Sequence, residues 1–185
     1  LILEEEPRDR AAVGAVFEIA EADDTLAAQA AHMLVSALSQ TNHYRDWVKA
    51  LELELVSEVD PVSRLHALRQ IAELEERQLN NVPAALDALL RALEVDSSVR
   101  EIHEHFMRLA SSKEDYEQYT KALTLACESV ADASLAQELW VRLGEVLKDK
   151  LARPGDAADA YEKACEAGGD QPRLLIALEQ LYTEL

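Results

Sequence analysis

Apolar residues recur at spacings of three and four along most of this chain, which is the period of an amphipathic helix. Leu65, Leu68 and Ile71 follow this spacing in one segment, and Leu135 and Leu139 follow it in another. The pattern predicts an all-α chain of about ten helices. The expected helices span 9–22, 25–40, 43–58, 61–79, 83–95, 98–110, 113–130, 133–151, 156–167 and 171–185.

Residues that favour helix ends separate these segments. Asp60 precedes Pro61, which is the pattern of an N-cap followed by proline at the first helical position, and Asp132 stands in the equivalent place. The other predicted boundaries are a capping box at Ser98 and Glu101, a restart at Asp156 after Pro154-Gly155, and a stop at Gly168-Gly169. Because the connections are short, neighbouring helices are expected to pack antiparallel as hairpins.

The sequence also repeats itself. The segment that begins at Tyr44 returns from Tyr116, 72 residues later, with fourteen identities over 51 gapless positions. Phe17 lies on the same register as Leu89. We therefore expect one domain over 1–185 that contains two copies, 44–115 and 116–185, after a more divergent portion at 1–43.

Half of this repeat, about 36 residues, is one helical hairpin, close to the tetratricopeptide length of about 34. The second copy contains W-x-x-L-G-x-x-[Y/L] followed by A-x-x-x-[Y/F]-x-x-A, and so resembles a tetratricopeptide (TPR) repeat. The resemblance implies a right-handed α-solenoid of antiparallel helical hairpins, with small residues at 72 and 144 where helices approach closely and large ones between successive hairpins. Half-a-TPR repeats are the nearest alternative. The motif positions are Trp140, Leu143, Gly144, Ala157, Tyr161 and Ala164, and in the first copy Leu68, Ile71, Ala72, Ala85, Leu89 and Ala92.

The formal charge is −18, from 36 acidic and 18 basic residues. The chain has no basic stripe of the kind that nucleic acids require, and an anionic membrane surface would repel it. No apolar run approaches the roughly 18 residues of a membrane span. We therefore expect a protein or peptide partner, basic or amphipathic in character, and neither nucleic acid binding nor membrane insertion.

Two cysteines, Cys127 and Cys165, lie among apolar helix positions and are expected to be small buried residues. The first residue is not Met, and no signal-peptide pattern follows it. We expect a segment of a larger, bacterial, multi-repeat protein in the cytoplasm.

No motif for catalysis or cofactor binding stands out, so the chain is expected to be neither an enzyme nor a cofactor or metal protein. His103 and His105 are two residues apart, on different helix faces, and are interpreted as surface or groove histidines. Acidic runs are interpreted as solvated helix faces; they comprise Glu52, Glu54, Glu73, Glu75 and Glu76.

The TPR resemblance implies that the first helix of each hairpin lines a concave groove that holds a partner segment. The residues carried over to this groove are His66, Arg69, Glu73, Glu76, Arg77, Glu138, Val141, Glu145, Lys148 and Asp149. Its basic residues are too few for the carboxylate clamp of chaperone-tail binders in this family. The alternatives are a structural spacer that associates end to end with itself, and an accessory domain of an enzyme that lies outside this chain.

Overall fold

The computed structural model describes residues 10–22 and 24–184, and within these ranges it contains ten α-helices and no strand. The all-α prediction is confirmed, and the boundaries agree with the expected ones to within a few residues. The helices are α2 (Arg10–Ala22), α3 (Asp24–Leu38), α4 (Tyr44–Ser57), α5 (Pro61–Arg77), α6 (Val82–Val95), α7 (Arg100–Leu109), α8 (Lys113–Ser129), α9 (Ala133–Asp149), α10 (Pro154–Gly168) and α11 (Pro172–Glu184).

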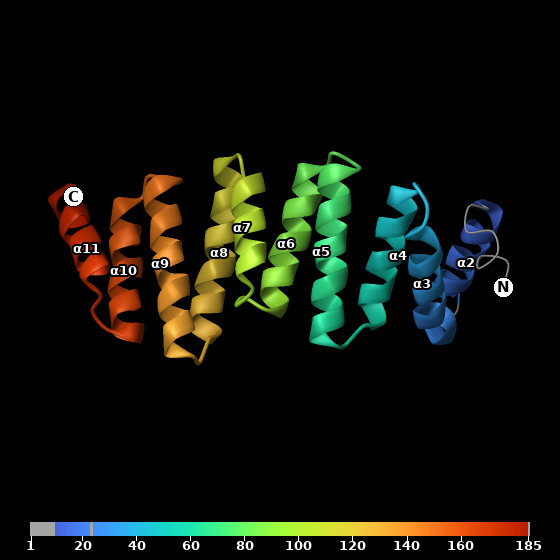
Figure 1. Cartoon of the computed structure of the whole chain (residues 1–185), viewed down its shortest axis with the longest axis horizontal. Helices are drawn as coiled ribbons and strands as arrows, with labels where there is room; N and C mark the ends of the chain where they lie inside the picture. The colour runs from blue at the N-terminus through green and yellow to red at the C-terminus, as the bar shows by residue number, and fades with distance from the viewer. Residues whose placement is uncertain (1–9, 23, 185) are drawn as a thin grey trace. The chain divides into compact units, whose positions relative to one another are not determined.

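The chain divides into two compact units, Leu1–Asp96 and Ser97–Leu185. The N-terminal unit contains α2 to α6, and each of these helices packs on the next along the chain (Figure 1). In the C-terminal unit, α8 packs on α9, α9 on α10 and α10 on α11. Each unit is therefore a row of sequential helices rather than a bundle around one centre.

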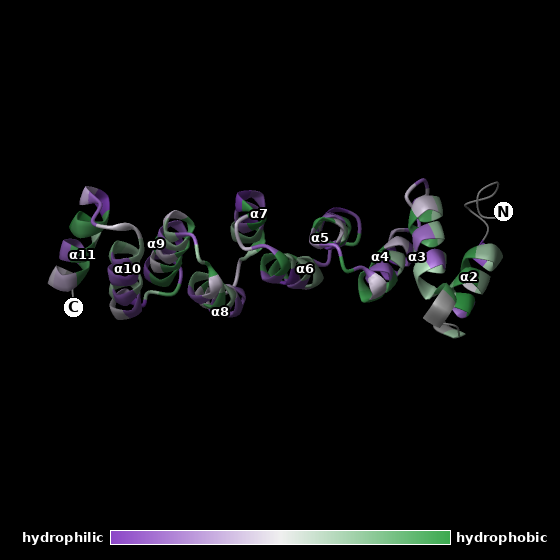
Figure 2. Ribbon diagram, turned by 90° about the horizontal axis from the view of Figure 1, so that it is seen from below, coloured by the Kyte–Doolittle hydropathy of each residue, from purple (hydrophilic) through white to green (hydrophobic). Residues whose placement is uncertain are grey.

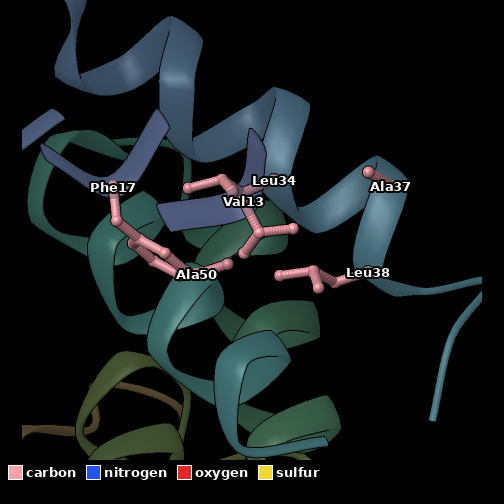
Figure 3. Packing of buried hydrophobic residues seen from close by; sticks show 6 residues of the cluster. All are labelled: Val13, Phe17, Leu34, Ala37, Leu38 and Ala50. Atoms are coloured by element: carbon pink, nitrogen blue, oxygen red, sulfur yellow. The ribbon is translucent and has the colours of Figure 1, made fainter. Parts of the chain in front are cut away.

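A core of six buried side chains joins the first three helices of the N-terminal unit. Figure 3 shows Val13 and Phe17 of α2 with Leu34, Ala37 and Leu38 of α3 and Ala50 of α4. Burying a side chain of this size contributes roughly 1.5–3 kcal/mol. Hydrophobic and hydrophilic surfaces alternate around most helices (Figure 2), as expected for helices that bury one face.

Two turns have the same backbone geometry at positions 72 residues apart. Before α6, the Asn81 amide donates to the Glu75 carbonyl at 2.7 Å, and before α10 the Arg153 amide donates to the Leu147 carbonyl at 2.9 Å. The residue preceding each donor has a positive φ, 52° at Asn80 and 54° at Ala152. The two sequence copies therefore build the same connection between their paired helices.

Two of the predicted helix starts are confirmed, and two are wrong. Asp60 and Asp132 accept from the amides of Ser63 and Leu135, each at 2.8 Å. Ser98 is not an N-cap, because α7 begins at Arg100 after Val99, which makes no side-chain cap hydrogen bond.

Helix α10 also begins earlier than predicted. It starts at Pro154, so Asp156 lies inside its first turn, where it pairs with Arg153. The predicted stop after this helix is confirmed, since Gly168 is its last residue and Gly169 follows with φ of 85°.

The motif positions form the contact surfaces within the paired helices, and all twelve are buried. A Cβ atom at Gly144 would lie 2.4 Å from Cε1 of Tyr161, so glycine is required there for α9 and α10 to pack this closely. Tyr161 therefore fills space inside the α9–α10 pair as well as being large, as the sequence suggested.

Within the part of the chain that the structure describes, each helix is too short or too polar to cross a membrane.

Candidate functional site

A groove of about 670 Å³ lies between α3, α4 and α5 in the N-terminal unit. It exists because side chains of α3 and α5 flank the outward face of α4 without meeting across it. The lining residues are His32, Val35, Ser36, Ser39, Trp47, Glu54, Glu58, Val62, Ser63, His66, Ala67 and Gln70.

Apolar side chains give the groove a surface that an apolar group of a ligand can contact. Trp47 is half-buried in its lining, and Val62 at the start of α5 is 75% exposed. Val56 and Val59, on either side of the turn between α4 and α5, are exposed as well. Exposed valines are ordinary singly, but three beside one groove form an apolar patch.

The Trp47 indole has a second feature, because its buried Nε1–H has no hydrogen-bond partner among the described residues. Leaving a buried donor unsatisfied costs roughly 1–3 kcal/mol. This donor is therefore a place where the folded chain loses stability rather than gaining it.

The charged side chains of the groove are acidic. Glu54 lies 3.3 Å from the exposed ring of His32, with 24% of its own side chain exposed. Glu58, one helical turn further along α4, accepts the Asp60 amide at 2.8 Å. The lining contains no Lys or Arg, so neither carboxylate has a permanently cationic partner within the groove.

The counterpart positions in the C-terminal unit carry a connected set of polar side chains. Tyr119, the counterpart of Trp47, lies 2.7 Å from Nδ1 of His103, and Nε2 of His103 lies 2.9 Å from the Ser97 carbonyl. A carbonyl only accepts, so Nε2 carries the proton, and the Tyr119 hydroxyl donates to Nδ1. Burial lowers the pKa of His103 and raises that of Tyr119, which keeps both groups neutral.

An arginine of the same unit extends this set. Arg142, the counterpart of Gln70, is half-buried, and its positive charge partly offsets the rise in the pKa of Tyr119. Its guanidinium lies 4.0 Å from Glu138, which is the counterpart of His66 and pairs with Arg100 at 2.7 Å. The C-terminal unit thus supplies its own cation at a position where the N-terminal groove has a neutral amide.

The structure places the predicted groove residues on exposed faces of two helices that belong to different units. On α5, His66 lines the groove described above, Arg69, Glu73 and Arg77 are exposed, and Glu76 is half-buried. On α9, Glu138 is held by Arg100, and Val141 and Lys148 are half-buried. Glu145 and Asp149 are exposed on the side near Tyr161, whose pKa rises to about 12 through burial and these two charges.

Several interpretations of single residues are wrong. His103 is buried at 2% exposure rather than on a surface, because Tyr119 of α8 and the Ser97 carbonyl enclose it. Glu75 is buried rather than solvated, since it faces the turn before α6 next to Asn81. Glu52 is half-buried in a bidentate pair with Arg91 of α6, with N–O distances of 2.7 and 2.8 Å.

The cysteines differ from each other. Cys127 is buried as expected, and burial raises the pKa of its thiol to about 12, which suppresses the reactive thiolate. Cys165 is only half-buried, contrary to expectation, because its side of α10 is not fully covered.

A smaller cavity of about 320 Å³ lies among α8, α9 and α10. Its cations already have partners: Lys163 lies over the Trp140 ring at 4.5 Å, and Arg153 pairs with Glu117 and Asp156. It therefore offers a ligand less uncompensated charge than the groove of the N-terminal unit.

The sequence analysis missed the groove residues Trp47, Glu54, Glu58 and Val62. A signal existed in the comparison of the two copies, because Glu54 and Glu58 stand where the second copy has Ala126 and Val130. Among the residues that the structure describes, no three His, Cys, Asp or Glu side chains come together to hold a metal ion.

No protein-family model matches the chain, and no curated protein matches it either.

Proposed function

We propose that this chain is a TPR-like helical repeat module that binds a segment of another protein. The observation that carries the proposal is the groove between α3, α4 and α5, which combines a tryptophan, an exposed valine and uncompensated carboxylates. Binding sites typically pair an apolar lining with a few polar groups in this way. An N-terminal unit that binds and a C-terminal unit that stabilises itself through His103 and Arg142 would divide these tasks between the two copies.

The proposal is tested by affinity purification with the full chain as bait. Val62→Glu introduces a charge into the groove without disturbing the core, because Val62 is 75% exposed. Leu125→Glu is the matched control, since Leu125 is an exposed apolar residue of α8 outside the groove. A specific partner that is retained by the wild type and by Leu125→Glu but lost by Val62→Glu supports a binding module. Equal retention by all three baits would remove the groove from the proposal.

The face predicted from the TPR resemblance is tested in the same experiment. Glu73→Lys combined with Glu145→Lys reverses two exposed charges that lie outside the groove lining. Loss of the partner from this bait, with retention by Val62→Glu, would move the binding surface to the α5 and α9 faces.

One observation favours self-association as a second function. Ala31 in α3 and His103 in α7 are both buried, at 0% and 2% exposure, whereas Leu175 stands at the same register in α11 and is 47% exposed. Ile176 and Tyr182 of α11 are exposed too. Sedimentation over a range of concentrations tests this function: dimers that disappear in Ile176→Glu support it, and a monomer at every concentration contradicts it.

A further inference from the structure

The comparison of the two copies, position by position, indicates which chemical group the N-terminal groove lacks. In the C-terminal unit, Arg142 is half-buried beside Glu138 and lowers the pKa of Tyr119. In the N-terminal unit these three positions carry Gln70, His66 and Trp47. The cation and its carboxylate partner are both gone.

Acidic residues have appeared on another helix instead. Glu54 and Glu58 of α4 replace the uncharged Ala126 and Val130 of α8, and they are four residues apart, on one face of the helix. The twelve groove-lining residues thus include two carboxylates and no Lys or Arg, while the twelve counterparts include two arginines, Arg108 and Arg142, and two glutamates. One copy balances its charge internally, and the other leaves two negative charges facing the groove.

The nearest permanent cation does not correct this imbalance. Arg64 of α5 donates from Nη1 to the carbonyls of Leu55 and Glu58, at 3.0 and 2.9 Å. Its guanidinium is therefore used by the last carbonyls of α4 and not by the side chains of Glu54 or Glu58. His32 touches Glu54 at 3.3 Å, but it is charged only when protonated.

We propose that the groove binds an arginine or lysine side chain presented by an amphipathic segment of a partner protein, with Glu54 and Glu58 as its anchor and Trp47 and Val62 as the apolar contact. This inference rests on the proposed function and specifies the partner that it requires. The cation comes from the partner because the position that supplies it internally, 142 in the second copy, is Gln70 in the first. A charged hydrogen bond at the rim of an apolar groove fixes orientation and selects against partners that lack the cation.

The test uses a helical Ala/Leu peptide of 14 residues that carries two arginines one turn apart beside its leucines. A second peptide has glutamine at both arginine positions. The protein carries Trp140→Phe, which leaves Trp47 as the sole tryptophan of the two in the chain and hence as the fluorescent reporter in the groove. We expect saturable binding of the arginine peptide, at least about fivefold tighter than that of the glutamine peptide.

Charge variants separate a local anchor from the general field of an acidic protein. Glu54→Gln with Glu58→Gln should abolish the preference, so that the two peptides bind alike. Glu73→Gln with Glu145→Gln changes the formal charge by the same amount outside the groove and should leave the preference intact. His66→Glu with Gln70→Arg copies the ion pair of the second unit into the groove and should weaken the arginine peptide severalfold.

Three results would overturn the inference. The first is equal affinity of the two peptides for the wild-type groove. The second is an equal loss in the Glu73/Glu145 variant, because the preference would then come from net charge alone. The third is the absence of binding by both peptides while a partner from the bait experiment is still lost on Val62→Glu; the proposed function would then stand, and its cationic anchor would not. Circular dichroism of each variant confirms that the helices remain folded.

Discussion

Ala152 and Asn80 have nearly the same backbone conformation, with φ of 54° and 52°, at equivalent places in the two copies. Asparagine tolerates this left-handed region, whereas alanine pays roughly 1–2 kcal/mol for the contact of its Cβ with the backbone. The turn before α10 holds this geometry because the amides of Leu151 and Arg153 donate to the carbonyls of Val146 and Leu147. The C-terminal unit therefore contains a strained residue that the N-terminal unit avoids.

We predict that Ala152→Asn raises the free energy of unfolding by about 0.5–1 kcal/mol, because it relieves this strain without removing a buried contact. Chemical denaturation followed by circular dichroism measures the change. The reciprocal substitution, Asn80→Ala, should lower stability by a similar amount. A stabilising effect of both substitutions would mean that the left-handed residue is not the determinant.

Gly144 acts at the same scale through space rather than conformation. Gly144→Ala would bring a Cβ within 2.4 Å of the Tyr161 ring, which is 5% exposed and has little room to move. We expect a loss of about 1–3 kcal/mol, as is usual for overpacking. Gly155→Ala is the control, because a Cβ there meets no atom within 4 Å and should be neutral or slightly stabilising. Thermal unfolding of the two variants decides between crowding and a general effect of alanine.

At the scale of elements, pairs of helices are held together by polar side chains as well as by apolar faces. Gln137 of α9 donates to the carbonyls of Ala164 and Gly169, at 3.0 and 2.8 Å, and accepts from Gln171 at 2.7 Å. Arg91 of α6 reaches across to Glu52 of α4 in the other unit's counterpart of this task. Such contacts fix how far one helix can slide along another.

The contact between α7 and α8 has a pH dependence that follows from His103. Burial lowers its pKa below the value of 6.5 in the unfolded chain, so the unfolded state binds more protons as the pH falls below 6.5. The stabilisation is complete above pH 6.5 and decreases as the pH falls toward the folded-state pKa. We predict that urea midpoints decline from pH 7.5 to pH 5.5 and that His103→Gln declines less. Identical pH profiles for both proteins would exclude His103 as the source.

At the scale of the whole molecule, the formal charge of −18 opposes the compact state through repulsion among 36 acidic groups. The ion pairs that the structure contains, such as Arg100 with Glu138, join side chains that are largely exposed and contribute little each. The balance of these effects is therefore repulsive at low ionic strength.

We predict that raising NaCl from 20 to about 300 mM, where the screening length falls to a few ångströms, raises the melting temperature by about 2–4 °C, equivalent to about 1 kcal/mol in a chain of this size. Differential scanning calorimetry measures it. The same salt should weaken binding of the arginine peptide described above, because that contact is attractive. A fall in the melting temperature would show that attractive pairs outweigh the repulsion.

The sequence by itself determined the elements of this protein. The period of its apolar residues specified ten helices, and Asp60, Asp132 and Gly169 marked ends that local hydrogen bonds and backbone conformation dictate. The pairing of Gly144 with Tyr161 was also accessible, because a small residue opposite a large one is needed wherever two helices approach closely. These features depend on neighbours within one helix or one hairpin.

Only the tertiary structure decided what the faces of those helices do. Glu75 and His103 have polar side chains but are buried, because the turn before α6 and the side chain of Tyr119 cover them. Trp47 and Tyr119 share one register position, yet Tyr119 finds a hydrogen-bond partner while Trp47 lines an open groove. The outcome depends on which residues two other helices present to that position, and such long-range contacts are not encoded in the period of the helix itself.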